Sequence, residues 1–210
     1  MNYGEVIAAA QAYVDRYDDE LVTAIPSFTR VVESKINTAL KVSGQAVQAT
    51  QIWLDEDETY YGLPADFGGM RDIQIVKKGE GGQAKTLVYV NPEEFLRVVA
   101  EPDRGRFCYT LVADQIRIPS PASDEMLELT YYQLVPPLTE MDESNWLTEK
   151  HPETYIFGLC AEMGAFAKDE QVFAGYDGRF KETLFNITQD DAVTRWSGPS
   201  LHTAVEGMVV

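Results

Sequence analysis

The spacing of apolar residues changes twice along the chain, and this change constrains the fold more than any single motif. Helical spacing of three or four residues holds over residues 1–44, alternation holds over 45–137, and helical spacing returns over 138–197. These periods are those of the α-helix and the β-strand. The sequence therefore predicts an α+β fold, in which a small antiparallel β domain is inserted into a helical flank resembling a four-helix bundle. Residues 198–210 are predicted to form an extended C-terminal tail.

Two helices are predicted in the first helical segment. Apolar side chains recur at helical spacing from Tyr3 to Tyr17, and the acidic run 18–20 is expected to end this helix. Pro26 is predicted to open the second helix, because a proline at the first helical position loses no hydrogen bond. Gly44 is its expected C-terminal cap. The apolar stripe of this second helix comprises Phe28, Val31, Val32, Ile36, Ala39 and Leu40.

The middle segment reads as a series of short strands. A helix is expected within it, capped by Asn91 and started by Pro92. The short connection Val112, Ala113, Asp114 between two alternating runs predicts a hairpin. The expected strands lie near residues 50–53, 72–77, 86–90, 107–111, 115–118 and 126–132.

Two further helices are predicted after the β segment. The first covers about 155–167, where Gly158 and Gly164 would allow close backbone approach. The second covers about 172–195 and carries a heptad-like stripe, which implies a narrow contact with a partner. Its members are Phe173, Tyr176, Phe180, Leu184 and Ile187.

The stretch LPADFGG at 63–69 interrupts the alternating region with strand breakers. Pro64 restricts Leu63 to extended geometry and removes a ladder donor. Asp66 is expected to accept backbone N–H groups in a turn, while Leu63 and Phe67 anchor both sides in the core. No base, nucleophile or metal partner accompanies Asp66, so the stretch is predicted to be a structural corner rather than a catalytic loop.

Charge and cysteine content exclude several classes of protein. The chain has 17 Lys and Arg against 34 Asp and Glu, a net charge of -17, which argues against a protein that grips nucleic acid. Cys108 and Cys160 sit in apolar patterns and are expected to be buried free thiols. We expect no signal peptide, because the first residues lack a basic flank and a cleavable apolar core. No apolar run approaches the roughly 20 residues of a membrane helix.

None of the motifs that could carry chemistry is complete. The loop 79–85 resembles a phosphate loop, but a predicted strand follows it where a helix is required, so a flexible hairpin loop is expected. The acidic run 55–58 lacks the spacing of a calcium loop and is expected to be solvated. His151 and His202 have no nearby nucleophile or ligand partner. The sequence therefore predicts a non-enzyme without catalytic residues, cofactor or metal.

The order of several short motifs resembles the head-to-tail adaptor family of tailed bacteriophages, as in short-tailed phages. The matching stretches, between about residues 3 and 190, are IPSF at 25–28, VESKI at 32–36, LPADF at 63–67, IRIP at 116–119, LTYY at 129–132, PL at 137–138, NWL at 145–147 and HPETY at 151–155.

The resemblance implies a structural virion protein of the neck, assembled in the host cytoplasm without a membrane partner. Such proteins form a homo-oligomeric ring, commonly dodecameric, which docks on the portal protein and extends its DNA channel. The ring presents a platform for tail nozzle or tail-tube proteins, and double-stranded DNA passes through it without specific binding. The acidic excess suits such a channel. In this reading the C-terminal helix and tail reach the portal, and the candidate docking residues are Trp196, Leu201, Met208, Val209 and Val210.

Two alternative functions remain open at the level of sequence. The chain could be a cell-wall glycosidase carried in the virion, since two carboxylates suffice for that chemistry, although 34 acidic residues make any pair easy to propose. It could also be a head-closure stopper that plugs the channel. Stoppers tend to be smaller and richer in β structure, whereas the helical flank dominates here.

Overall fold

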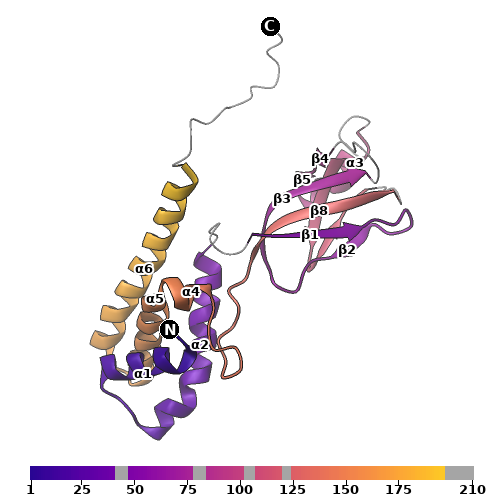
Figure 1. Cartoon of the computed structure of the whole chain (residues 1–210). Helices are drawn as coiled ribbons and strands as arrows, with labels where there is room; N and C mark the ends of the chain where they lie inside the picture. Colours follow the sequence, from indigo (N-terminus) through magenta and orange to yellow (C-terminus); the bar gives the residue numbers. More distant parts are fainter. Residues whose placement is uncertain (41–46, 78–83, 102–106, 120–123, 197–210) are drawn as a thin grey trace. The chain divides into compact units, whose positions relative to one another are not determined.

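The structure, a computed structural model, describes residues 1–40, 47–77, 84–101, 107–119 and 124–196; for 47–49 and 194–196 it describes the backbone alone. The chain divides into two compact units. The helical unit comprises Met1–Gly44 and Val135–Val210, and the β unit comprises Gln45–Leu134 (Figure 1). The predicted α+β fold class is confirmed.

Helix α5 is the centre of the helical unit, where it packs against α1, α2, α4 and α6. It is apolar around most of its circumference, as expected of a buried helix. Its Tyr155, Leu159 and Cys160 are fully buried, and they meet Val32 of α2 and Phe180 of α6 in one core. The helices of this unit are α1 (Tyr3–Val14), α2 (Asp19–Ala39), α4 (Trp146–Lys150), α5 (Pro152–Phe166) and α6 (Glu170–Trp196).

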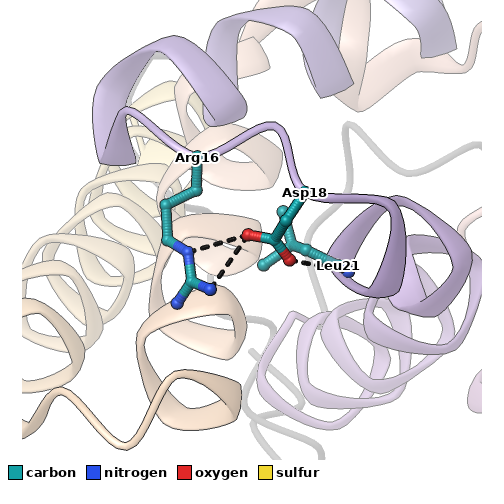
Figure 2. A network of polar contacts seen from close by, with 3 residues as sticks. All are labelled: Arg16, Asp18 and Leu21. Atoms are coloured by element: carbon teal, nitrogen blue, oxygen red, sulfur yellow. Dashed lines mark hydrogen bonds and ion pairs between the residues drawn. The ribbon is translucent and has the colours of Figure 1, made fainter.

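The turn between α1 and α2 corrects the predicted helix boundaries. Helix α1 ends at Val14, because Asp15 adopts a left-handed φ of 51°. Asp18 then caps α2 by accepting a hydrogen bond from the Leu21 N–H at 3.1 Å (Figure 2). The acidic run at 18–20 therefore starts α2 instead of ending α1, since carboxylates are favoured at helix N-termini.

Arg16 reinforces this cap. Its Nε and one terminal nitrogen lie 3.0 and 2.9 Å from Oδ2 of Asp18 (Figure 2). Partial desolvation raises the pKa of Asp18, but the Leu21 hydrogen bond and the Arg16 charge outweigh it, so the pKa lies below its ordinary value. The carboxylate therefore stays charged as a cap in mildly acidic solution.

The predictions for Pro26 and Gly44 were wrong. Pro26 lies inside α2, on an exposed face of the helix, where water can satisfy the carbonyl that a proline leaves without its helical donor. Helix α2 ends at Ala39, and the extended Leu40 is its C-terminal cap. Gly44 lies outside the described residues and is not needed to end the helix.

The β unit contains two four-stranded sheets among its described residues, with orders β1-β8-β3-β4 and β2-β7-β6-β5. Long strands β1 and β3 flank β8 in antiparallel register. Leu127 and Leu129 of β8, Ile73 of β3 and Ile116 of β7 are buried in one core. The elements are β1 (Val47–Trp53), β2 (Tyr60–Gly62), β3 (Phe67–Lys77), β4 (Lys85–Thr86), β5 (Val88–Tyr89), α3 (Pro92–Val99), β6 (Cys108–Val112), β7 (Gln115–Arg117) and β8 (Glu125–Gln133).

Most predicted strands are confirmed, and two details differ. Strand β2 was missed because only three residues pair. The single strand predicted at 86–90 is two short strands in different sheets, β4 and β5. The buried Leu87 between them donates its N–H to the Ile73 carbonyl. Strand β5 also runs parallel to β6, so the β unit is not purely antiparallel.

The predicted hairpin at Val112–Asp114 is confirmed. Val112 of β6 pairs with Gln115 of β7, leaving Ala113 and Asp114 as the loop, and Ala113 has a positive φ of 53°. Cys108 and Cys160 are buried and form no disulfide, as expected. Within the described part of the chain, no helix has the length and apolar character needed to cross a membrane.

Candidate functional site

The stretch LPADF forms the corner that connects β2 to β3, and hydrogen bonds join it to neighbouring segments. The Leu63 N–H donates to the Asp114 carbonyl at 2.9 Å, and the Phe67 N–H donates to the Pro64 carbonyl at 3.0 Å. Leu63 packs against the core of the β unit. The Phe67 ring lies 5.8 Å from that of Tyr131 on β8. These contacts hold the chain on both sides of Pro64.

The carboxylate of Asp66 accepts hydrogen bonds from two side chains, and not from the backbone N–H groups that were predicted. Its Oδ1 accepts a hydrogen bond from the Tyr131 hydroxyl at 2.9 Å, and its Oδ2 accepts one from the Gln133 side-chain amide at 2.7 Å. The Asp66 carbonyl also accepts the Leu134 N–H. Asp66 therefore ties the corner to β8. Burial, with the hydrogen bond and charge of Asp66, raises the pKa of Tyr131 to about 12, so the phenol stays a donor across the physiological range.

A second polar network, which the sequence reasoning missed, fixes the segment 135–145 to the helical unit. Asn37 of α2 accepts the Val135 N–H at 2.8 Å, and Glu33, one turn earlier, accepts the Leu138 N–H at 2.6 Å. The Tyr155 hydroxyl also bonds to Glu33. The only sequence signal for this role was a Glu beside the buried Val32 in the apolar stripe of α2.

Glu33 is a buried carboxylate, only 8% exposed. Burial raises its pKa above the ordinary value, although the Leu138 and Tyr155 hydrogen bonds and the nearby Arg30 charge act in the opposite direction. Burial also raises the pKa of Tyr155. A carboxylate that keeps its proton more readily is a feature of acid–base sites, but also of structural networks.

Asn145 completes this network at the start of α4. Its Oδ1 accepts the N–H groups of Leu147 and Thr148, and its side-chain amide donates to the Pro136 carbonyl and the Tyr155 hydroxyl. Asn37, Glu33 and Asn145 each have hydrogen-bond partners in this network. We therefore interpret it as a clamp on the segment returning from the β unit.

The predicted close approach of the last two long helices is confirmed. A Cβ on Gly164 of α5 would lie 2.7 Å from the Phe173 nitrogen of α6, and one on Gly158 would lie 2.7 Å from Val32 of α2. Phe180, Leu184 and Ile187 of the predicted stripe are buried in the shared core. This stripe serves packing within the chain, mainly against α5.

The remaining predicted residues are not brought together into a site. The backbone of Trp196 ends α6, its side chain is not described, and Leu201, Met208, Val209 and Val210 lie outside the described residues. His151 joins α4 to α5, with Nδ1 3.5 Å from Glu153, and His202 is not described. Of the residues described, none form a group of three or more His, Cys, Asp or Glu suited to a metal.

The acidic run 55–58 forms an exposed turn next to β2. The Tyr61 hydroxyl accepts the Asp55 N–H, and its single hydrogen is shared between the carbonyls of Asp55 and Glu58, at 3.0 and 3.1 Å. Residues 79–83 of the loop 79–85 lie outside the described residues. Lys85, at the end of this loop, begins strand β4.

A model of the SU10 adaptor protein family matches residues 1–202, nearly the whole chain. The chain belongs to the SU10 adaptor protein family. This is a family of phage head-to-tail adaptors, so the resemblance found in the sequence is confirmed. No curated protein matched the chain.

Membership of the SU10 adaptor family gives the chain a structural role in the neck of the virion. The family implies association with portal and tail proteins. The corner and the clamp are then scaffolding of an adaptor: the first fixes the start of β3 on β8, and the second fixes the returning chain on α2 and α5.

Proposed function

We propose that the chain assembles as a homo-oligomeric ring, commonly dodecameric in such adaptors, between the portal and the tail. The ring extends the DNA channel and has no catalytic activity of its own. The observation that carries this proposal is the family match over residues 1–202, which covers the β unit and all the described residues of the helical unit.

A closed ring needs two different complementary faces on each subunit. Exposed apolar side chains on two separate helices support this requirement. Phe185 and Val193 on α6 are 61% and 66% exposed, and Val22 on α2 is 46% exposed. They are candidates for contacts between copies or with neighbouring virion proteins.

The charge of the chain supports a channel that lets DNA pass. With 34 acidic against 17 basic residues, a ring would repel the phosphate backbone wherever acidic side chains reach its lumen, and DNA would slide without sticking. We further propose that Trp196, Leu201, Met208, Val209 and Val210 dock on the portal, since the tail combines apolar residues with few charges.

Electron microscopy of the purified protein, alone and mixed with the portal of the same virion, tests the proposal. We expect rings bound to the narrow end of the portal, with a subunit number set by native mass spectrometry. A protein that stays monomeric and unbound at high concentration with the portal would contradict it. A peptidoglycan-clearing assay tests the absence of catalysis, and activity lost in one acid-to-amide variant with retained fold would favour the glycosidase instead.

A further inference from the structure

A cleft of about 580 Å³ opens on the helical unit between α1, α2 and the residues that precede α4. Its walls are mainly apolar, with a few charged groups, as in many sites that bind another molecule. The lining residues include Val22, Arg30, Glu33, Glu140 and Met141.

Met141 stands at this cleft on a loop held by its own hydrogen bonds. The Thr139 hydroxyl accepts the N–H groups of Met141 and Asp142 at 3.2 and 3.0 Å, and the Thr139 N–H donates to the Asp142 carbonyl at 3.1 Å. The Met141 side chain is 95% exposed. A flexible thioether presented on an ordered loop suits an interface, because methionine adapts to the shape of a partner.

The charges at the cleft favour a cationic partner. Among the lining residues one cation, Arg30, stands against two carboxylates, Glu33 and Glu140. Glu140, Asp142 and Glu143 around Met141 are exposed, and no cation of the described residues pairs with them in the salt bridges. The apolar cleft therefore has an acidic border.

We propose that this cleft and Met141 receive an apolar side chain of a partner protein, flanked in that partner by Lys or Arg. A second copy of the chain is a poorer occupant of this cleft, because the acidic border calls for basic residues opposite it and the chain has only 17 Lys and Arg against 34 Asp and Glu. The inference rests on the neck role of the chain, which makes the portal and tail proteins the partners to test, but not on ring formation.

Val22 and Val31 provide a matched pair of variants for the test. Both are exposed valines of α2, 46% and 42% exposed, and only Val22 lines the cleft. The full-length protein and its V22Q, M141S and V31Q variants are titrated against the purified portal and, separately, the purified tail protein that adjoins the neck. An E140K/D142K variant and a salt series report on the acidic border, and circular dichroism confirms that each variant is folded.

We expect V22Q and M141S to weaken binding to one of these partners about tenfold each, whereas V31Q stays within about twofold of the wild type. E140K/D142K should weaken the same complex further, and the wild-type affinity should fall with salt. Equal effects of V22Q and V31Q, or none from V22Q and M141S while the wild type binds, overturn the inference and leave the neck role intact.

Two other results are also decisive. If V22Q and M141S impair self-association and not partner binding, the cleft is an interface between copies, and the proposed cationic partner is wrong. If the wild type binds neither the portal nor the tail protein, the neck role itself fails for this chain, and the inference fails with it.

Discussion

Glu33 shows how a single buried charge can both organise and destabilise a fold. It accepts the Leu138 N–H and bonds to Tyr155, but it is almost removed from water. A raised pKa means that the folded state holds the Glu33 proton more tightly than the unfolded state does. The contribution of Glu33 to stability is therefore complete below pH 4.5, the ordinary pKa of a glutamate. It is lost as the pH rises through the raised pKa of the folded state.

We therefore expect Glu33→Gln to flatten the dependence of unfolding free energy on pH above 4.5 and to preserve or raise stability at neutral pH. The amide keeps an acceptor for Leu138 without a buried charge. Glu33→Ala should instead lower stability by about 1–3 kcal/mol, because it leaves the Leu138 and Tyr155 donors without an acceptor. Urea unfolding at a series of pH values measures both. A Gln variant as destabilised as the Ala variant would show that the charge itself is required.

Asp66 offers a second test at the same scale. Asp66→Ala removes the acceptor of both Tyr131 and Gln133, and we expect a loss of about 1–3 kcal/mol, since Tyr131 is buried and its hydroxyl would lack a partner. Asp66→Asn retains one acceptor oxygen and should lose less. It should also lower the pKa of Tyr131 from about 12, which a difference titration of tyrosine absorbance detects. An unchanged melting temperature in both variants would contradict the claim that Asp66 stabilises the corner.

The partners of these residues mark the limit of what the sequence could predict. Local rules predicted a corner at Pro64 and backbone N–H donors for Asp66, but the carboxylate accepts from two side chains instead. They could not show that the donors come from Tyr131 and Gln133, because strand pairing decides that. The role of Glu33 was hidden for the same reason: its partners Leu138 and Tyr155 lie far along the chain, and a Glu on a helix is normally solvated.

At the scale of the elements, α5 and α6 pack so closely at Gly164 that a larger side chain has no room there. Gly164→Ala would place a methyl group 2.7 Å from the Phe173 nitrogen and 2.9 Å from Val172. Because the nearest atom belongs to backbone, we expect a loss of about 1–3 kcal/mol, measured by thermal or urea unfolding.

Gly178 on α6 provides the matched control. A Cβ there would meet nothing within 4 Å, so Gly178→Ala should stabilise the helix by up to about 1 kcal/mol through propensity alone. If Gly164→Ala were as harmless as Gly178→Ala, the close approach of α5 and α6 would be wrong.

Periodicity predicted the elements better than their ends. The long helices and the main strands were found because their buried faces repeat regularly. The boundary of α2 was missed because Pro26 looked like a start, whereas Asp18 supplies a capping carboxylate a full two turns earlier. The split of residues 86–90 between two sheets depends on the burial of Leu87, which no local pattern reveals.

At the scale of the whole molecule, the tail gives the clearest test of portal docking. We expect truncation after Trp196 to leave the helicity and unfolding of the monomer unchanged while weakening co-sedimentation with the portal. Circular dichroism and sedimentation measure the two effects separately. Full portal binding by the truncated protein would contradict docking by the tail, and a collapse of helicity would show that the tail belongs to the core.

The pairing of β1 with β8 has a consequence for how such adaptors diversify. Val47 pairs with Tyr132, so the β unit begins and ends on adjacent strands. In the helical unit, the side chain of Asn37, just before the end of α2, holds the Val135 N–H, so the two points where the chain leaves and returns are also neighbours. A segment with such closely spaced ends is an exchangeable cassette. We expect a short linker in its place to leave the helical unit folded.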